Sequence, residues 1–239
     1  MVLHLAIIQR TEIQINCMKD KNLTRNNIGL LLCLIVLILF LPVLSTKDQL
    51  FKSILFTAII FFGTFSLDFA KRAQKILIVS GIVTICLNWI VFFVTSDRLS
   101  LVFSFSYFFY NLFIVVFMVR HVAKSAKVDL TIIISSINGY LLLGILGALF
   151  MGIVEIVHKL IYNLDSGAIN FAGGAAEGFH DYLYFSFVTM TTLGYGDVTP
   201  VSAFAKSVTM TIAVTGQFYM TILIAILVGK YLSGAADKS

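Results

Sequence analysis

The chain has 239 residues, of which 59% are hydrophobic and only 12% are charged, and its formal net charge is +5. Soluble globular domains rarely have this composition, so we expect a membrane protein. No basic patch is interleaved with aromatic residues, which argues against a nucleic-acid-binding protein. The three cysteines, Cys17, Cys33 and Cys86, form no CxxC or Cys/His cluster, so we expect neither a disulfide framework nor a metal site of that kind.

Six apolar runs are long enough to cross a bilayer, since about 20 helical residues span about 30 Å of hydrocarbon. They lie near residues 27–44, 51–69, 76–94, 99–119, 130–157 and 203–231. The first run follows Lys19, Lys21 and Arg25, as the apolar part of a secretory signal would. It is long for such a signal and no convincing cleavage site follows Pro42, so an uncleaved first helix is the simpler interpretation. The fold predicted is therefore an all-α membrane protein with six transmembrane helices.

The distribution of charge predicts the orientation of these helices. If the amino terminus is cytoplasmic, the inside segments hold most of the basic residues: Arg10, Lys19, Lys21, Arg25, Lys71, Arg72, Lys75, Arg120, Lys124, Lys127, Lys230 and Lys238. Acidic residues collect in the outside segments: Asp48, Asp97, Glu155, Asp165, Glu177, Asp181 and Asp197. This positive-inside bias predicts that both termini are cytoplasmic in a plasma membrane, for which we expect a bacterial inner membrane.

The chain divides into four parts along its length. Residues 1–26 are expected to be a cytoplasmic segment, either an interfacial helix or a mobile one, to which the sequence assigns no role. Residues 27–122 are expected to form a four-helix transmembrane domain, residues 123–232 a pore domain, and residues 233–239 a short cytoplasmic tail.

The segment between the two long helices of this domain, at 130–157 and 203–231, indicates a pore. Residues 158–178 are rich in Gly, Ala, Asn and Asp and are expected to form an extracellular turret. Residues 179–191 are apolar and aromatic, but a helix of this length is only about 20 Å long and cannot cross the bilayer. Chain that enters the membrane and returns as non-helical backbone is tolerated only where protein buries it or water lines it. The sequence therefore predicts a re-entrant pore helix beside a pore or cavity.

The residues that follow this short helix have the chemistry of an ion filter. Gly194 and Gly196 are separated by one residue, so the backbone between them can adopt left-handed dihedrals and direct consecutive carbonyl groups toward one axis. Carbonyl oxygens can replace the water around a K⁺ ion without binding it as strongly as carboxylates would. The run DYLYFSFVTMTTLGYGDVTP at residues 181–200 resembles the pore helix and filter of the tetrameric potassium channel family.

That resemblance implies a filter at residues 192–197. The carbonyl groups of Thr192, Leu193, Gly194 and Tyr195 would coordinate K⁺, Gly196 would complete the ion-binding stretch, and the Thr192 hydroxyl would close the inner site. Leu193 departs from the Val that is usual in the family, but only its carbonyl would face the ion, so we expect selectivity to survive. The carboxyl end of the pore helix would direct its partial negative charge at a central cavity, which favours a cation there.

Residues around the filter are expected to support it. By the same resemblance, Thr191 would brace the filter from behind, and Tyr184 and Phe185 stand where the family keeps aromatic residues. Tyr184 is predicted to donate its hydroxyl to Asp197. Val188 stands where some bacterial channels carry a glutamate that pairs with this aspartate, so that carboxyl pair is absent here. Ordinary packing in the core or against lipid is the alternative role for the two aromatic residues.

The last helix continues the resemblance. Gly216 lies in its middle, where the family uses a glycine as a bending point, and close packing against another helix is an equally good explanation. Thr215, Tyr219, Ile222 and Ile226 fall near one helical face, so some of them should line an inner vestibule.

Small and polar residues in the other helices predict contacts between helices. Gly144, Ala148 and Gly152 recur every four residues, a stripe that lets another helix approach closely. Asn88 and Asn111 are expected to be buried and to hydrogen-bond between helices, rather than to bind a ligand.

Each chain supplies one loop, whereas a ring of carbonyl groups needs several, so the resemblance implies a homotetramer embedded in membrane lipid. K⁺ is then the permeant ion, and no organic cofactor or nucleic-acid partner is expected. Six spans with a pore loop between the last two also resemble the plan of voltage-gated channels, so residues 27–122 resemble a voltage-sensor domain. The run at 99–119 contains no Lys or Arg, however, and steep voltage gating needs several charges per subunit, so this domain lacks the charges of a sensor. Only eight residues follow Tyr231, too few for a nucleotide-binding or calcium-sensing domain. We therefore expect weakly voltage-dependent or background K⁺ conduction, and the sequence leaves a regulatory partner open.

Three other functions agree less well with the sequence. A nonconducting membrane sensor or accessory channel subunit would use the first four helices, but an intact filter argues against it. An enzyme could use Glu155 and His158 as an acid/base pair, but no nucleophile, metal cluster or third partner accompanies them, so no enzyme is expected. Potassium transporters typically carry four degenerate pore loops in one chain, and this chain has one complete loop.

Overall fold

The protein is described by a computed structural model that covers residues 2–42, 49–67, 71–94, 96–125, 129–162, 167–172, 174 and 178–236, with side chains from residue 21 onward except at 71, 97, 162 and 233–236. These described residues form seven helices and two short strands. In chain order they are α1 (Val2–Phe40), α2 (Gln49–Phe65), α3 (Lys71–Phe93), α4 (Asp97–Lys124), α5 (Leu130–Tyr162), β1 (Ile169–Phe171), α6 (Phe179–Met190), β2 (Val198–Pro200) and α7 (Ala203–Ala236).

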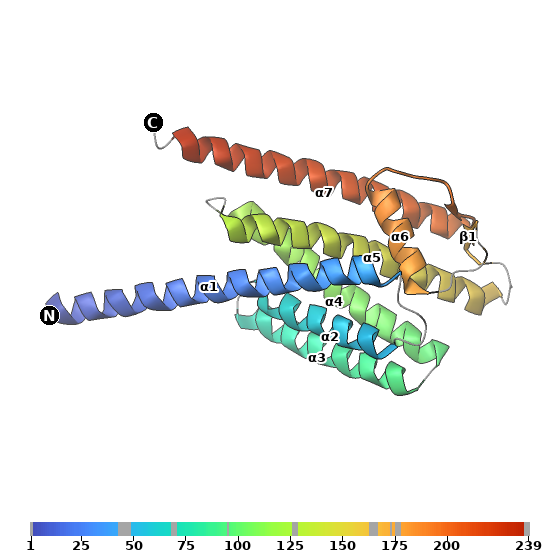
Figure 1. Cartoon of the computed structure of the whole chain (residues 1–239), viewed down its shortest axis with the longest axis horizontal. Coiled ribbons are helices and arrows are strands. Elements are labelled where there is room, and N and C mark those ends of the chain that lie inside the picture. The colour runs from blue at the N-terminus through green and yellow to red at the C-terminus, as the bar shows by residue number, and fades with distance from the viewer. Residues whose placement is uncertain are drawn as a thin grey trace.

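The six long helices lie side by side, and each runs in the direction opposite to the one before it (Figure 1). The start of α1 and the end of α7 consequently lie at the same end of the bundle, as an even number of crossings requires. Helices α1 to α4 contact one another in sequence, and α5 packs on both α1 and α4. On its other side α5 carries α6 and α7, so α5 lies between the four-helix part and the part that holds the predicted filter (Figure 1).

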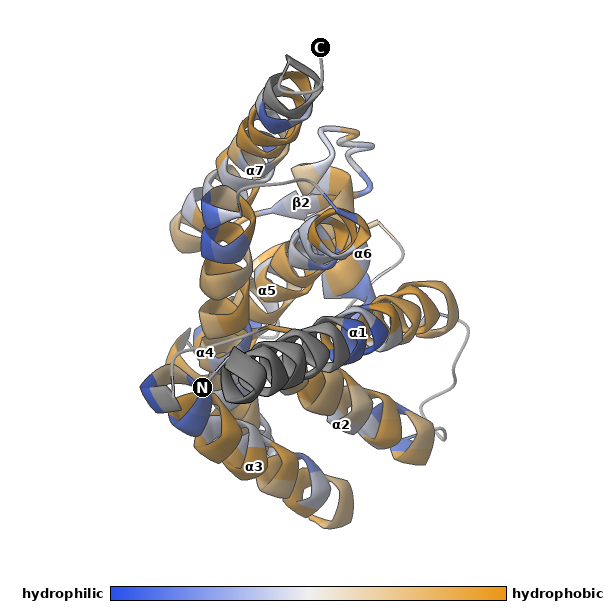
Figure 2. Ribbon diagram, turned by 90° about the vertical axis from the view of Figure 1, so that its left-hand side faces the viewer, coloured by the Kyte–Doolittle hydropathy of each residue, from blue (hydrophilic) through white to orange (hydrophobic). Residues whose placement is uncertain are grey.

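Five described helices are long and apolar enough to cross a membrane, within 21–40, 72–93, 98–124, 130–161 and 203–232. Helix α2 is also apolar but has only 17 residues, about 25 Å of helix, at the lower limit for a span. Apolar residues cover most of the length of all these helices (Figure 2), because a surrounding bilayer removes the need for a polar outer face. The chain is therefore a multi-pass membrane protein, and the sixth crossing by α2 stays a prediction.

Hydrogen bonds between helices hold α2, α3 and α4 together. The Asn88 amide of α3 donates to the Ser53 carbonyl of α2 at 3.0 Å, as predicted. The Thr64 and Tyr110 hydroxyls join α2 to α4 at 2.8 Å. The prediction for Asn111 was wrong, because its amide donates to the Tyr107 carbonyl one turn earlier in α4. A helix interior offers its own carbonyl to such a side chain, so a buried Asn does not by itself predict a bond to another helix.

A buried polar cluster joins α1 to α5. The Asn27 amide of α1 donates to the Leu23 carbonyl and to the Ser66 carbonyl at the end of α2, and its side-chain oxygen accepts the Ser135 hydroxyl of α5 at 3.0 Å. The Asn138 amide donates back to the Asn27 carbonyl at 2.9 Å. Asn27 and Asn138 are fully buried, so these bonds fix how the four-helix part sits on α5.

The helices extend beyond the expected bounds at several points. Helix α1 begins at Val2, so the first span expected from residue 27 is part of a longer helix, and α5 continues to Tyr162, into the region expected to be turret. A helix can continue through polar residues as long as its backbone hydrogen bonds continue. Hydropathy therefore predicted the apolar part of each helix better than it predicted where the helix begins and ends. The rest of the expected turret at 163–166, 173 and 175–177, and the tail at 237–239, lie outside the described residues.

Candidate functional site

Helix α6 packs closely against α5 through the predicted stripe of small residues. A Cβ atom at Gly144 would collide with the ring of Phe187, and one at Gly147 would collide with the Ser186 hydroxyl. That hydroxyl, fully buried, donates to the Gly144 carbonyl at 2.7 Å. At Gly152 a Cβ atom would meet only Tyr182, at 3.6 Å. The close approach predicted for the stripe is therefore confirmed at Gly144 and is looser at Gly152, whereas the equally close contact at Gly147 was not predicted.

The backbone that follows α6 alternates in handedness. Thr192, Gly194 and Gly196 have φ angles of 64°, 55° and 81°, whereas Leu193 and Tyr195 between them have none in the positive range. Glycine adopts such angles readily, but a left-handed angle at the β-branched Thr192 costs about 1–2 kcal/mol. Strain of this kind persists where the surrounding contacts hold it and is typical of functional sites.

Hydrogen bonds to the end of α6 hold this backbone. The N–H of Thr192 donates to the Thr189 carbonyl at 3.1 Å, and the N–H groups of Leu193 and Gly194 both donate to the Val188 carbonyl, at 3.0 and 3.3 Å. In a planar trans peptide the C=O points opposite to the N–H. The carbonyl groups of Thr191, Thr192 and Leu193 therefore point away from α6, to the same side.

An alternation of right- and left-handed residues extends this arrangement, because it places successive N–H groups on one side and successive C=O groups on the other. A row of carbonyl oxygens along one side of the chain, with no carboxylate among them, can replace the hydration shell of a weakly held cation. The arrangement suits conduction, in which an ion must leave as easily as it enters.

A two-stranded sheet fixes the far end of the row. Strands β1 and β2 pair antiparallel, with Phe171 opposite Val198, and the Asp197 carbonyl accepts the Ala172 N–H at 2.9 Å. The Ala168 carbonyl accepts the N–H groups of Val201 and Ser202, at 2.9 and 3.1 Å. Backbone hydrogen bonds thus hold the chain at both ends of the row, and these bonds do not depend on the type of side chain.

Glu155 connects this two-stranded sheet to α5. Its buried carboxylate accepts the Ala168 N–H at 2.8 Å and lies 3.2 Å from the Lys159 ammonium one turn later. The carboxylate therefore has a structural role, because it joins the residue before β1 to α5. Sequence reasoning missed the role, although a buried acid followed by Lys four residues later was a usable signal.

Asp197 binds Tyr184 at the outer end of the row. The Tyr184 hydroxyl donates to the Asp197 carboxylate at 2.6 Å, as predicted, and the second carboxylate oxygen accepts the Val198 N–H at 3.1 Å. This hydrogen bond raises the pKa of Tyr184 to about 12. The hydroxyl therefore remains a donor throughout the physiological pH range.

The other residues expected to support the filter, Phe185, Val188 and Thr191, lie on α6 or directly after it. Phe185 is buried in the core. Val188 was expected to matter through its side chain. Its carbonyl is the group that accepts the N–H groups of Leu193 and Gly194, a role that side-chain patterns do not predict. The Thr191 hydroxyl donates to the Phe187 carbonyl at 2.6 Å, within the last turn of α6, so bracing of the filter by Thr191 stays a prediction.

Helix α7 packs against the carboxyl end of α6 at Gly216. A Cβ atom there would collide with the Met190 side chain and lie 2.8 Å from its carbonyl, which the Gln217 amide also approaches at 3.4 Å. Close packing therefore explains Gly216, α7 is one continuous helix, and a bending role stays a prediction.

Only part of the predicted vestibule face is free. Tyr219 packs on Tyr140 of α5 and donates its hydroxyl to the Ser136 carbonyl at 2.8 Å, so its side chain is used in a contact between helices. Thr215 and Ile222 are exposed on α7 in the single chain.

The row of carbonyl groups stands at the surface of the single chain. Leu193 is 59% exposed and Tyr195 is 68% exposed, and neighbouring α7 exposes Met210, Val214 and Phe218. The row thus lies beside a large apolar and aromatic surface of the single chain.

Comparisons with known proteins point to the same region. Residues 149–232, about a third of the chain, match the sequence profile of a family described as "Ion channel". Two-pore potassium channel 4 of Arabidopsis thaliana is 36% identical over 63 residues, which are 26% of this chain and 22% of that protein. The chain thus spans less than a quarter of the length of this relative. No solved structure was found to match. The chain therefore contains an ion channel domain at residues 149–232.

Proposed function

We propose that the chain forms a potassium-selective channel that conducts K⁺ passively, with residues 192–196 as its filter and Asp197 at the outer mouth. The observation that carries this proposal is the direction of the carbonyl groups, fixed by the alternating φ angles and by the N–H bonds to Val188 and Thr189. The similarity to a potassium channel over 63 residues supports the choice of ion.

A homotetramer is the assembly we propose. One chain supplies one row of carbonyl groups, and a cation needs oxygen atoms on all sides, so identical rows must close around an axis. The exposure of Leu193 and Tyr195 beside the apolar residues of α7 supports this, because copies of the same surface would cover both.

The proposed channel is weakly voltage-dependent or of background type. Within α4 the described basic residues lie near its ends, at Arg98, Arg120 and Lys124, and the apolar stretch between has none. One charge that crosses 100 mV changes the energy by about 2.3 kcal/mol, so steep gating requires several charges within the span.

Six crossings and cytoplasmic termini complete the proposal. The shared end of α1 and α7 in Figure 1 supports an even number of crossings, and the basic residues Lys21, Arg72 and Lys124 gather toward that end. A plasma membrane, and in a bacterium the inner membrane, is the location we propose.

The test is ion flux into liposomes that contain the purified protein, measured with K⁺ and with Na⁺ as the only permeant cation. We expect K⁺ flux well above Na⁺ flux, and we expect Tyr195→Ala to reduce the difference. Equal flux of the two ions would contradict the proposal. No flux of either ion from folded tetramers would favour the nonconducting sensor or accessory subunit instead.

A further inference from the structure

Helix α5 separates most of the four-helix part from α6, but a contact between two aromatic rings reaches past it. Phe56 of α2 lies against Phe179, the first residue of α6, with ring centroids 5.9 Å apart and ring planes at 67°. Edge-to-face pairs of this kind are favourable beyond the area that they bury. In Figure 1 the beginning of α6 lies near the beginning of α2. The four-helix part therefore contacts the helix that precedes the proposed filter.

Phe56 is itself held by aromatic rings of α4. Its ring meets Tyr107 edge-to-face at 5.3 Å and Phe103 at 6.3 Å, and these two rings stack on each other at 5.8 Å. Tyr107 is fully buried and stacks on Tyr110, whose hydroxyl donates to the Ile60 carbonyl of α2. The position of the Phe56 ring is therefore fixed by α2 and α4 together.

The first turn of α6 is closed by local hydrogen bonds. The Gly178 N–H donates to the Asp181 carboxylate at 3.3 Å, and the Asp181 N–H donates to the Gly178 carbonyl at 3.2 Å. Close contacts with other helices follow in the second half of α6, where Ser186 meets α5 and Met190 meets α7. The contact with Phe56 therefore ties the beginning of α6 to the four-helix part.

A change in position at the beginning of α6 reaches the row of carbonyl groups. The helix has 12 residues and is about 18 Å long, and Ser186 holds it to α5 near its carboxyl end. If the first turn moves, the helix tilts about Ser186, and the Val188 carbonyl turns with it. That carbonyl accepts the Leu193 N–H at 3.0 Å and the Gly194 N–H at 3.3 Å, so the longer bond to Gly194 is the first to weaken.

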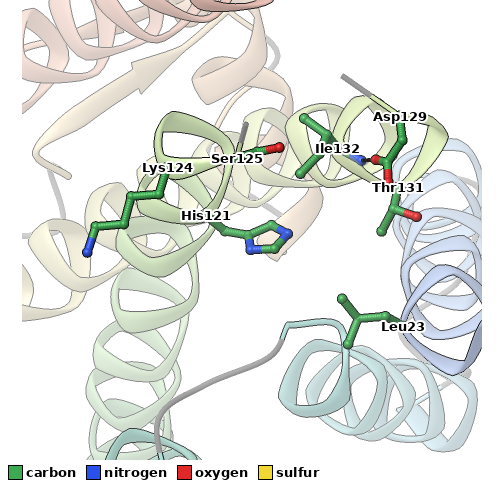
Figure 3. A pocket seen from close by; sticks show the side chains of 7 residues that line it. All are labelled: Leu23, His121, Lys124, Ser125, Asp129, Thr131 and Ile132. Carbon is green, nitrogen blue, oxygen red and sulfur yellow. Dashed lines mark hydrogen bonds between the residues drawn. The ribbon is translucent and has the colours of Figure 1, made fainter. Parts of the chain in front are cut away.

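At the opposite end of the bundle the four-helix part reaches α7 instead of α6. The Lys230 ammonium of α7 donates to the Val122 and Ala123 carbonyls of α4, at 2.6 and 3.1 Å. A cavity of about 350 Å³ lies beside that turn, where α4 ends and α5 begins, and Figure 3 shows Lys124 directed away from it. Neither feature involves a residue of α6, so the contact at Phe179 is the more direct route from the four-helix part to the filter.

We propose that Phe56 and Phe179 are positioning residues for K⁺ binding, because their contact fixes the tilt of α6 and so holds the row of carbonyl groups firmly. The inference rests on the proposed channel function, and it makes the four-helix part a support of the filter. The handedness of the row depends on Thr192, Gly194 and Gly196. Loss of the contact therefore weakens K⁺ binding and leaves the preference for K⁺ over Na⁺ in place.

The experiment measures the melting temperature of the purified tetramer in detergent while K⁺ replaces Na⁺ at constant ionic strength. An ion that binds the folded protein raises this temperature, and the K⁺ concentration needed for a given rise scales with the dissociation constant. We expect Phe56→Leu and Phe179→Leu each to need about twofold to tenfold more K⁺ for the same rise. The double variant should need about as much as either single variant, because both substitutions remove the same contact.

Phe108→Leu is the matched control. It removes a ring contact between α4 and α5, with the Phe108 and Phe150 centroids 5.3 Å apart, and leaves the contact with α6 in place. We expect its melting temperature to fall and its K⁺ requirement to equal that of the unmodified protein.

A lower melting temperature with an unchanged K⁺ requirement in Phe56→Leu and Phe179→Leu would show a purely structural contact and overturn the inference. An equal increase in Phe108→Leu would overturn it in favour of general loosening, and full additivity in the double variant would show that the two rings act separately. If K⁺ and Na⁺ stabilise the unmodified protein equally, the channel proposal fails and this inference fails with it. A K⁺ response that is present but identical in all variants contradicts this inference alone.

Discussion

The two sides of α5 depend on different chemical groups. On the α6 and α7 side, backbone groups carry the site: carbonyl direction, positive φ angles and glycines that admit close contacts. On the side of α1 to α4, side chains dominate, with buried aromatic rings and side-chain hydrogen bonds between helices. Substitutions in the first region should therefore alter which ion passes, whereas those in the second should alter stability.

The largest effect is expected at Gly194, whose φ angle is 55°. In Gly194→Ala the left-handed angle costs about 1–2 kcal/mol, which shifts the population of the correct backbone about tenfold and should abolish the difference between K⁺ and Na⁺ flux. Gly174 is a matched control, since its φ angle is 116° and a Cβ atom there would also meet nothing within 4 Å. Loss of ion discrimination in Gly174→Ala as well would show that general strain, not filter geometry, is responsible.

The next effect concerns the contact between α5 and α6. In Gly144→Ala the added methyl group meets the ring of Phe187, and we expect overpacking to destabilise the fold by about 1–3 kcal/mol. Gly152→Ala, where the nearest atom is 3.6 Å away, should be neutral or stabilising because Ala favours the helix. Thermal unfolding of both variants in detergent checks the difference in sign, and equal melting temperatures would contradict it.

On the other side of α5, Asn27→Ala should destabilise the protein by about 1–3 kcal/mol, because it leaves buried partners on α2 and α5 unpaired. The ratio of K⁺ to Na⁺ flux should not change. Asn26→Ala removes one exposed bond, to the Phe65 carbonyl, and should have a smaller effect on the melting temperature. A change in ion selectivity in Asn27→Ala would break the division between the two regions.

A smaller effect is expected from Tyr184→Phe, which removes the hydroxyl that donates to Asp197. Without this bond the backbone at Asp197 is held less firmly, and we expect the current to decay faster at constant voltage. Because the bond is exposed in the single chain, the expected increase in the decay rate is only about twofold to fivefold. Because the folded-state pKa is raised from 10 to about 12, the contribution of the bond is present below pH 10 and is lost as the pH rises through 12. Wild-type current should accordingly show no transition due to Tyr184 between pH 7 and pH 9.

The smallest effect is expected at Arg120, near the end of α4 and 5.9 Å from the Phe117 ring. Arg120→Gln should leave the voltage dependence of the current unchanged, because the charge lies outside the apolar stretch of α4. Current–voltage curves of the two proteins should superimpose after scaling. A large change in steepness would show that α4 senses voltage despite its composition.

The sequence predicted the apolar helices well, because apolar length is a property of residue type, and it predicted left-handed backbone at the glycines Gly194 and Gly196 for the same reason. It did not predict the left-handed angle of Thr192 or the role of the Val188 carbonyl, since backbone hydrogen bonds leave no mark on side-chain identity. Lys230 and the end of α4 are 107 or more residues apart, and their contact depends on how whole helices pack. The sequence left open which residues of the Thr215 face of α7 contact another helix, and only the packing shows that Tyr219 does.

The central claim is tested most directly by the reversal potential of purified tetramers in a planar bilayer, with K⁺ on one side and Na⁺ on the other. A filter made of the carbonyl groups of Thr192 to Tyr195 predicts a large reversal potential, of the sign that K⁺ efflux requires, and its loss in Gly194→Ala. A reversal potential near zero in the unmodified protein would contradict the account.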